Sequence, residues 1–249
     1  MEIYTKELTS LQHPLVKYLV KLRKERGFRL EEKKLLLQGK KAILEYPEQI
    51  DTLLITKKMP LSLPLSPKRS YWVSQEMIKK ISGSPSPEPY LATVPLPSFS
   101  PLNGKTRLLA LDRISDPGNL GTLIRTALAL GCDGIFLTTP SADPFMDKAL
   151  RAAKGATFHL PLCMGTEEEL LSLIKHNNAF VYIADRKGTS TFSFSLPFVL
   201  ILGNESHGVS KPLQSQGSSI AIPISNATNS LNVAVAGGIL MYAFQRALD

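Results

Sequence analysis

Three short polar stretches in the second half of the chain carry the residue types that could do chemistry. They are residues 116–125 (DPGNLGTLIR), 202–208 (LGNESHG) and 222–233 (IPISNATNSLNV). Each stretch follows a short apolar run, and loops that follow buried strands are the usual ligand sites of α/β proteins. Their Asn, Ser, Glu and Arg side chains are of the kinds that hold a ribose or a phosphate. The three stretches together therefore predict one active site.

The first stretch reads as a turn that leads into a helix. Asp116 begins the turn, and Asn119 is placed to cap the helix that follows. Gly121 allows a close approach of the backbone, and Arg125, one helical turn later, can reach back over the loop. A capped helix with a surface arginine is the alternative interpretation. The pattern is neither a dinucleotide-binding fingerprint nor a P-loop.

The second stretch follows residues 198–202, the most apolar of the predicted strands. Two glycines bracket four polar residues in the order Gly203, Asn204, Glu205, Ser206, His207 and Gly208. A plain turn needs fewer polar groups, so this loop is a candidate for chemistry. The alternatives are a helix N-terminal carboxylate for Glu205 and an ordinary loop residue for His207.

The third stretch follows a predicted strand at 219–224 and precedes a predicted helix at 231–248. Ser230 is the expected N-cap of that helix, and Asn232 then lies in its first turn, facing the loop. No hydrolase triad is indicated, because Asp185 and His207 lack the flanking residues of a nucleophile elbow.

The elements that must position these loops alternate along residues 106–249. We expect strands at 108–114, 134–138, 180–184, 198–202 and 219–224, and helices at 121–130, 144–154, 167–176 and 231–248. Apolar strands separated by helices are typical of a mostly parallel sheet covered on both faces.

The first part of the chain predicts a smaller α/β module. We expect an amphipathic helix at 9–27, strands at 35–37, 52–56 and 71–73, and a helix that begins at Gly39. A Pro- and Ser-rich stretch then reads as a linker. The expected organisation is an N-terminal domain at 1–95, a linker at 96–105 and a C-terminal domain at 106–249.

The net charge of +8 lies almost wholly in the first part of the chain. Residues 1–104 hold 17 Lys and Arg against 10 Asp and Glu. Such an excess fits a nucleic-acid partner, because cationic side chains gain affinity by releasing counterions from its phosphates. An anionic membrane surface is the competing partner, but no amphipathic anchor or lipidation signal accompanies the charge.

The cysteines and histidines indicate neither a disulfide framework nor a metal site. Cys132 and Cys163 are far apart in apolar surroundings, and the four histidines lack metal-ligand spacing. The N-terminus has no signal-peptide pattern, and the longest apolar run is too short to span a bilayer. We therefore expect a cytoplasmic protein with neither a metal nor a membrane partner.

Taken together, the three stretches resemble the motifs of the SpoU (TrmH) branch of the SPOUT RNA methyltransferases. The family's Asn-x-Gly-x-x-x-Arg is matched by Asn119, Gly121 and Arg125. Its Gly-Asn-Glu-x-x-Gly is matched at 203–208, and its Ile-Pro-hydrophobic and Ser-Leu-Asn-Val segments are matched at 222–224 and 230–233. The order and spacing agree over about residues 106–248. Residues 10–17 and 35–39 are similar to the L30e-like RNA-binding domain that often precedes this one.

The resemblance implies an α/β SPOUT domain with a trefoil knot behind a smaller L30e-like domain. It implies S-adenosylmethionine as the cofactor, with Gly203, Ile222 and Leu231 as contacts and Thr138 as a further candidate. It also implies a homodimer whose active site is completed across the interface. The basic side chains expected to bind RNA are Lys17, Lys21, Arg23, Lys24, Arg26, Lys40 and Lys41.

Two departures from the family's pattern bear on substrate choice. The chain has Asn226 where the third motif usually has Gly, and Asn tolerates left-handed dihedral angles better than other non-Gly residues. The chain also has Gln38 before Gly39 and His13 before Pro14, where the N-terminal domain commonly has Glu and Asn.

The reaction implied is methyl transfer to a ribose 2′-hydroxyl, with ribosomal RNA expected in preference to transfer RNA. We assign catalytic roles to Asn119, Arg125, Asn204, Glu205, Ser230 and Asn232. Arg125 is a poor general base because an arginine side chain stays protonated in proteins. We expect it to grip a phosphate and polarise the hydroxyl, while the other residues position the nucleotide and accept or relay the proton. The alternatives are a transfer-RNA substrate or a non-catalytic RNA-binding protein that keeps the fold.

Overall fold

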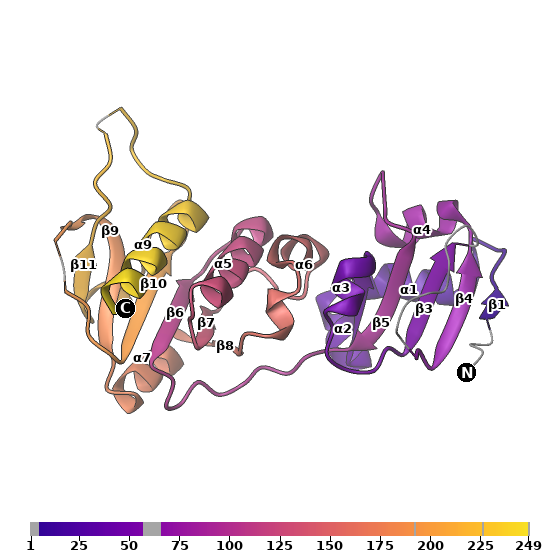
Figure 1. Cartoon of the computed structure of the whole chain (residues 1–249), viewed down its shortest axis with the longest axis horizontal. Helices are drawn as coiled ribbons and strands as arrows, with labels where there is room; N and C mark the ends of the chain where they lie inside the picture. Colours follow the sequence, from indigo (N-terminus) through magenta and orange to yellow (C-terminus); the bar gives the residue numbers. More distant parts are fainter. Residues whose placement is uncertain (1–4, 57–65, 192, 226, 249) are drawn as a thin grey trace. The chain divides into compact units, whose positions relative to one another are not determined.

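The computed structural model describes residues 5–56, 66–191, 193–225 and 227–248. Their contacts group into two compact units, residues 1–98 with 145–158 and residues 99–144 with 159–249. The segment 145–158 was expected in the C-terminal domain, but its contacts lie with the first unit. Figure 1 shows the helices and strands of both units.

The described residues of the first unit form a mixed five-stranded sheet in the order β1-β4-β3-β5-β2. Its strands are β1 (Thr5–Glu7), β2 (Lys34–Gln38), β3 (Thr52–Thr56), β4 (Arg69–Val73) and β5 (Tyr90–Pro95). β3 pairs in parallel with β4, while β5 runs antiparallel to both β2 and β3.

The helices of the first unit are distributed according to the period-two alternation of the strands. Leu36 of β2 packs into one buried cluster with α1 (Pro14–Lys24) and α4 (Gln75–Ser82). Its neighbours Leu35 and Leu37 pack into a second cluster. That cluster receives Ile43 of α3 (Lys40–Leu44) and Leu150 of α6 (Asp147–Ala153). Successive side chains of a strand point to opposite faces, so β2 contributes to two cores.

The described residues of the second unit form six parallel strands in the order β11-β9-β10-β6-β7-β8. They are β6 (Arg107–Asp112), β7 (Gly134–Thr138), β8 (Leu162–Gly165), β9 (Phe180–Thr189), β10 (Phe198–Gly203) and β11 (Ser218–Ile220). β10 lies in the middle, and all five of its residues 198–202 are buried. Continuous apolar runs of this kind are typical of a parallel sheet that is covered on both faces.

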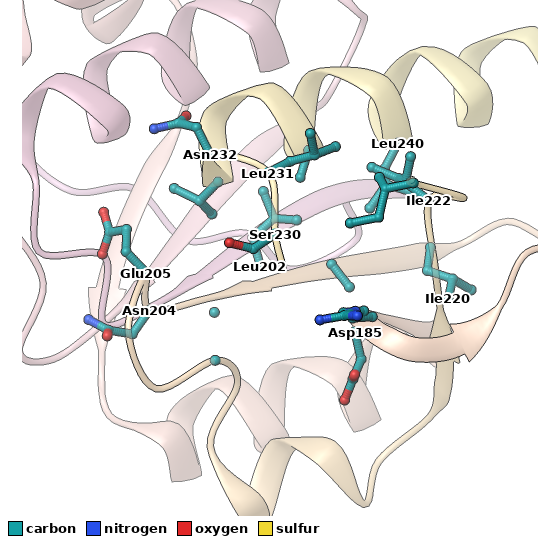
Figure 2. A pocket seen from close by; sticks show the side chains of 17 residues that line it. Asp185, Leu202, Asn204, Glu205, Ile220, Ile222, Ser230, Leu231, Asn232 and Leu240 are labelled. Atoms are coloured by element: carbon teal, nitrogen blue, oxygen red, sulfur yellow. The ribbon is translucent and has the colours of Figure 1, made fainter. Parts of the chain in front are cut away.

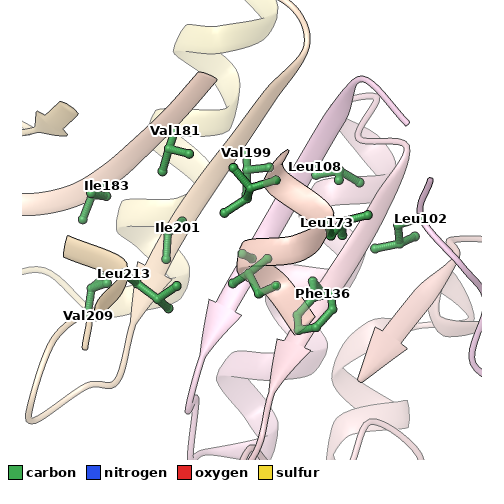
Figure 3. Close-up of a cluster of buried hydrophobic side chains, with 13 residues drawn as sticks. Leu102, Leu108, Phe136, Leu173, Val181, Ile183, Val199, Ile201, Val209 and Leu213 are labelled. Carbon is green, nitrogen blue, oxygen red and sulfur yellow. The ribbon is translucent and has the colours of Figure 1, made fainter. Parts of the chain in front are cut away.

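Helices cover both faces of this parallel sheet. On one face, α7 (Glu167–His176) and α8 (Lys211–Gln214) pack over Leu108, Phe136 and Ile201 (Figure 3). On the other face, α5 (Pro117–Ala129) and α9 (Val233–Leu248) lie side by side. Gly237 makes this close packing of α9 possible. A Cβ built at that position would lie only 2.5 Å from Leu123 of α5 and 2.6 Å from Leu202 of β10.

Several predicted elements differ from the observed ones at their ends. The predicted helix at 9–27 is two helices, α1 and α2 (Arg26–Glu32), with Glu25 in extended conformation between them. The predicted strand at 219–224 ends at Ile220, and the predicted helix at 231–248 begins at Val233. The residues between these two elements are therefore a longer loop than expected. β1, β5, β8, α4 and α8 were not predicted.

Candidate active site

The three polar loops meet at one edge of the parallel sheet. β10 pairs with β6 in parallel, with Gly203 opposite Asp112, so the chain leaves both strands at the same edge. In the loop after β10, the backbone groups of Asn204 and Gly208 hydrogen-bond to each other in both directions. A Cβ at Gly203 would lie 2.2 Å from the backbone of Gly208, so this tight loop requires glycine there.

The carboxylate of Glu205 joins the loop after β10 to the start of α5. One of its oxygens accepts hydrogen bonds from the amide and the hydroxyl of Ser115, at 3.3 and 3.0 Å. The other oxygen accepts from the amide of Asp116 at 3.3 Å and from the side chain of Asn119 at 3.0 Å. Four donors therefore hold this one carboxylate.

These hydrogen bonds change the acidity of Glu205. Partial burial raises the pKa of its carboxyl, but the hydrogen bonds from Asn119 and Ser115 outweigh burial and leave the pKa below its usual range. A carboxylate in this state is a weak proton acceptor at neutral pH. Its geometry fits the positioning of the loops better than the relay of a proton.

Asn119 extends the connection to the third loop. Its side-chain oxygen accepts a hydrogen bond of 3.0 Å from the side-chain nitrogen of Asn232. We call Glu205, Asn119 and Asn232 the amide–carboxylate chain, because each hydrogen-bonds to the next. Three segments that lie far apart in the sequence are thus joined by side chains.

Asn232, and not Ser230, caps the last helix. The side-chain oxygen of Asn232 accepts hydrogen bonds from the backbone amides of Ala234 and Val235, at 2.9 and 3.4 Å. The prediction that Ser230 is the cap is wrong because α9 begins at Val233, two residues later than expected. The side chain of Ser230 instead lines the pocket described below, and its hydroxyl makes no hydrogen bond with any described residue.

Asn204 organises its own loop and joins it to the end of β6. Its side-chain oxygen accepts from the amides of Ser206 and His207. It also lies 3.0 Å from the Nδ1 atom of the His207 ring. Its side-chain nitrogen donates to the carbonyl oxygen of Arg113 at 2.8 Å. Asn204 therefore uses both of its polar atoms to fix the loop.

A buried carboxylate, which the sequence analysis missed, supports this edge of the sheet. Asp112 is fully buried and accepts hydrogen bonds from the Arg113 guanidinium, the hydroxyl of Thr138 and the amide of Ser210. The bond to Asp112 also raises the pKa of Arg113. Arg113 has a φ of +56°, in the left-handed region. The only sequence signal was a charged pair at the end of an apolar run.

Thr138 does not line the pocket, contrary to its assignment as a cofactor contact. It is fully buried, and its hydroxyl donates to Asp112 and accepts from the amide of Arg113. A hydroxyl in this arrangement has no surface to offer to a ligand.

A pocket of about 400 Å³ opens beside the amide–carboxylate chain. In Figure 2, Asn204, Glu205 and Asn232 lie on one side of it, and Ile220, Ile222 and Leu240 lie on the other, together with Asp185. The apolar lining comprises Leu202, Ile220, Ile222, Ile224, Leu231 and Leu240. Gly203, Ile222 and Leu231, which were assigned as cofactor contacts, all line this pocket. Apolar walls with a few polar groups are typical of small-molecule sites.

Arg125 lies outside the lining of this pocket. Its side chain is on the exposed face of α5, and it makes no hydrogen bond or ion pair with any described residue. Asn226, the departure in the third motif, lies outside the described residues.

Most of the basic side chains assigned to RNA are exposed on the first unit. Lys17, Lys24 and Lys40 project from α1 and α3 into solvent. Arg23 is an exception, since its guanidinium donates to the carbonyl oxygen of Ser82 and packs where a Cβ of Gly83 would lie. Lys21 lies 4.2 Å from the ring centre of Phe28. The remaining members of the set, Arg26 and Lys41, are also exposed.

None of the helices in the described part of the chain is long and apolar enough to cross a membrane. In the same residues, no group of three His, Cys, Asp or Glu side chains is placed to hold a metal ion.

A parallel sheet with polar loops and a pocket at the carboxyl ends of its strands is typical of an α/β protein that binds a small-molecule ligand. Residues 106–242 match the model of the SpoU rRNA Methylase family. The chain therefore belongs to this family of S-adenosylmethionine-dependent RNA methyltransferases.

Similar proteins cover nearly the whole chain. A tRNA/rRNA methyltransferase of Synechocystis sp. is 34% identical over 96% of this chain and 93% of its own length. The 23S rRNA (guanosine(2553)-2′-O)-methyltransferase RlmP of Bacillus subtilis is 33% identical over 69% of this chain and 71% of its own. The AdoMet-bound rRNA methyltransferase of Sinorhizobium meliloti has a TM-score of 0.84 and 29% identity over 98% of both chains.

These findings confirm the predicted SPOUT fold class, the enzyme class and the cofactor. The pocket fits S-adenosylmethionine, because its apolar walls suit an adenosine and the acidic residues Asp185 and Glu205, on opposite sides of the lining, suit a cationic ligand. Asp185 and Arg186, at the middle of β9, also line the pocket and were not assigned. A charged pair after a buried run was the signal that could have found them.

Proposed function

We propose that this protein transfers the methyl group of S-adenosylmethionine to a ribose 2′-hydroxyl of ribosomal RNA. The observation that carries the proposal is the division of the pocket into apolar walls and a polar end. The walls fit the cofactor. Asn204 and Asn232 shape the polar end, and the Ser230 hydroxyl, which makes no hydrogen bond with any described residue, fits a ribose. The names of the relatives from B. subtilis and S. meliloti support ribosomal RNA as the substrate.

The residues of the pocket contribute mainly by positioning. The bound cofactor supplies an electrophilic methyl group, and the hydroxyl oxygen must lie in line with it. Holding two reactants in such a geometry lowers a barrier by roughly 7–11 kcal/mol in favourable cases. Ser230 has a hydroxyl that is free among the described residues and faces the pocket, so it is placed to orient the ribose.

Arg125 and Glu205 have different roles in this proposal. Arg125 remains protonated, so it grips a phosphate of the RNA and polarises the hydroxyl. Glu205 is held by four donors and has a lowered pKa, so it fixes the loops that shape the polar end. Comparison of the pH–rate profiles of Arg125→Lys and Glu205→Gln tests this division. Loss of the rate-controlling ionisation in the Arg125 variant alone would make Arg125 the base.

A homodimer through α5 and α9 completes the proposal. Large apolar side chains are exposed on these neighbouring helices: Leu128 at 37%, Val235 at 51%, Ile239 at 43% and Tyr242 at 56%. We call them the α5–α9 face. Exposed apolar groups of this size, gathered on two packed helices, are typical of an interaction surface. Arg125 lies on the same side of α5 as Leu128, three residues away, so a second copy would bring the guanidinium of Arg125 toward a partner's pocket.

The exposed lysines of the first unit are the proposed RNA-binding residues. They contact phosphates, which fix the position of an RNA but carry no sequence information. The choice between ribosomal and transfer RNA therefore needs an experiment.

The experiment is a map of 2′-O-methylated nucleotides in total RNA from cells with and without the protein. Loss of a single site in ribosomal RNA, restored by the wild-type gene but not by Ser230→Ala, is the expected result. Loss of a site in transfer RNA instead would identify transfer RNA, and not ribosomal RNA, as the substrate. An unchanged map, together with cofactor binding by the purified protein, would leave a non-catalytic RNA-binding protein.

A further inference from the structure

The loop between β11 and α9 supplies much of one pocket wall but is joined weakly to the rest of the unit. Ile222, Ile224, Ser230 and Leu231 from this loop line the pocket. Asn232, at the end of the loop, donates a hydrogen bond to Asn119 of α5. Hydrogen bonds among residues 222–231, such as the one from the Thr228 amide to the Ser225 carbonyl oxygen, join the loop to itself. The wall residues between Ile222 and Leu231 therefore depend on few hydrogen bonds to other elements.

One side chain connects this loop to the neighbouring strand. The guanidinium of Arg186, on β9, donates to the carbonyl oxygen of Asn229 at 3.1 Å and lies 3.4 Å from its side-chain oxygen. Among the described residues of 222–231, these are the hydrogen bonds that reach another element. Arg186 also lines the pocket, next to Asp185. Arg186 therefore links β9, on one side of the pocket, to the loop that forms the wall.

We infer that Arg186 is a positioning residue that closes the cofactor pocket by holding the loop at Asn229. It acts on the wall of the pocket and not on the ligand. The adenosine part of a ligand needs the apolar wall residues Ile222 and Leu231, which this loop carries. Loss of the Arg186 bonds lets the wall open, so affinity falls for any ligand that uses the wall.

A direct contact between Arg186 and the ligand is the competing explanation. The cofactor carries a carboxylate at its amino-acid end, and an arginine beside the pocket could pair with it. The two explanations differ in which ligands lose affinity when Arg186 is replaced. A positioning residue affects the adenosine end as well, while a direct ion pair affects only ligands with a carboxylate.

The test measures equilibrium binding to the full-length protein by calorimetry, with two probes. S-adenosylhomocysteine has the amino-acid end, and 5′-methylthioadenosine lacks it. Arg186→Met is expected to weaken both probes by a similar factor, on the order of threefold to tenfold, as the loss of one or two hydrogen bonds implies. Arg186→Lys, which keeps one donor, is expected to recover part of the loss.

The matched control is Lys187→Met, which removes the neighbouring exposed cation. The side chain of Lys187 is exposed and makes no hydrogen bond or ion pair with any described residue, while its amide donates to Asp185. Its substitution is expected to leave both affinities unchanged. Weakening of S-adenosylhomocysteine alone by Arg186→Met, an equal effect of Lys187→Met, or no effect of either would overturn the inference.

The inference rests on the methyltransferase function but can fail independently of it. Binding of S-adenosylhomocysteine by the wild-type protein tests the cofactor assignment, whatever the variants do. If the wild type binds and Arg186→Met binds equally well, the function stands and the role of Arg186 falls. If the wild type does not bind either probe, the proposed function falls first.

Discussion

The side-chain nitrogen of Asn232 donates a hydrogen bond of 3.0 Å to the side-chain oxygen of Asn119, which lies 113 positions earlier in the chain. The same Asn232 caps α9 through its side-chain oxygen, and the same Asn119 donates to Glu205. One amide therefore starts a helix and also joins two loops of the site. This double use makes the two roles separable by mutation.

Asn232→Asp and Asn232→Ala should separate capping from the connection to Asn119. Aspartate keeps an acceptor at the N-cap, so the free energy of unfolding should stay within about 0.5 kcal/mol of wild type. Alanine removes the cap and should cost about 1 kcal/mol. Both variants lose the donor to Asn119 and should lower kcat. Urea unfolding and single-turnover methylation measure the two effects.

Ser230→Ala is the control for the cap. Because the helix begins at Val233, this substitution should leave stability unchanged while it lowers methyl transfer. A loss of stability as large as that of Asn232→Ala would show that Ser230 caps α9.

Glu205→Gln should destabilise the protein in a pH-dependent manner. The pKa of Glu205 is lowered in the folded state, so its stabilising contribution is present at neutral pH, above the unfolded pKa of about 4.3. The contribution is lost as the pH falls through the lowered folded-state pKa. At neutral pH we expect the free energy of unfolding of the wild type to exceed that of Glu205→Gln by about 1 kcal/mol. Solvent screening of the exposed carboxylate keeps this difference small. The difference should vanish in acid.

Urea unfolding of both proteins from neutral to strongly acidic pH measures the difference in the free energy of unfolding. A constant difference from neutral to strongly acidic pH would mean that the charge of Glu205 does not stabilise the loops. The variant's pH–rate profile near neutrality should keep the wild-type apparent pKa, because Glu205 is already ionised there.

Two adjacent glycines in α9 should respond in opposite ways to alanine. A Cβ at Gly237 would meet Leu123 and Leu202 at 2.5 and 2.6 Å, so Gly237→Ala should cost about 1–3 kcal/mol. A Cβ at Gly238 would meet only Thr126, at 3.7 Å. Gly238→Ala should therefore be neutral or stabilise by about 0.5–1 kcal/mol through helix propensity. Thermal unfolding of the two variants compares them directly, and equal melting temperatures would contradict the packing.

The Cys132 thiol should resist alkylation in the folded protein. Burial, aided by the charge of Asp133, raises the pKa of Cys132 to about 12. Little thiolate is then available at mildly alkaline pH, and the thiolate is the reactive form. Mass spectrometry after a timed exposure to iodoacetamide should show Cys132 unmodified in buffer and modified in urea. Rapid modification of Cys132 in buffer would show that this region opens readily.

Ile239→Glu should convert a dimer into a monomer. The substitution places a charge in the centre of the α5–α9 face, where a second copy would have to bury it. Leu30→Glu is the matched control, because Leu30 is 53% exposed on α2 of the other unit. Sedimentation velocity should show the control with the wild-type mass. A wild-type monomer, or a dimeric Ile239→Glu variant, would exclude this interface.

The sequence by itself determined the type and order of most elements of the second unit. Residues 167–176 form α7 as predicted, because Thr166 and Glu169 make a capping box whose signals are local. The apolar run at 198–202 likewise predicted the central strand β10. Local propensity and hydrophobic pattern suffice where the neighbours along the chain decide the conformation.

The sequence also singled out Asn119, Asn204, Glu205 and Asn232, because each lies near the end of a predicted strand or the start of a predicted helix. The prediction that Asn119 caps its helix is wrong, since α5 begins at Pro117 and Asp116 caps it by accepting from the Asn119 amide. The sequence did not show which of these residues caps a helix, which fixes a loop and which lines the pocket. Ser230 and Asn232 are both good N-cap residues, and only the observed helix start at Val233 decides between them.

The tertiary structure alone decided which partners each polar group found. The four donors to Glu205, the burial of Thr138 against Asp112 and the bond from Arg186 to Asn229 all join residues far apart in the sequence. Such contacts depend on which strands pair and in which register, and no local pattern encodes that choice. The residue types of the site were therefore legible in the chain, whereas their division into cap, support, pocket wall and polar end was set by the parallel sheet that places them together.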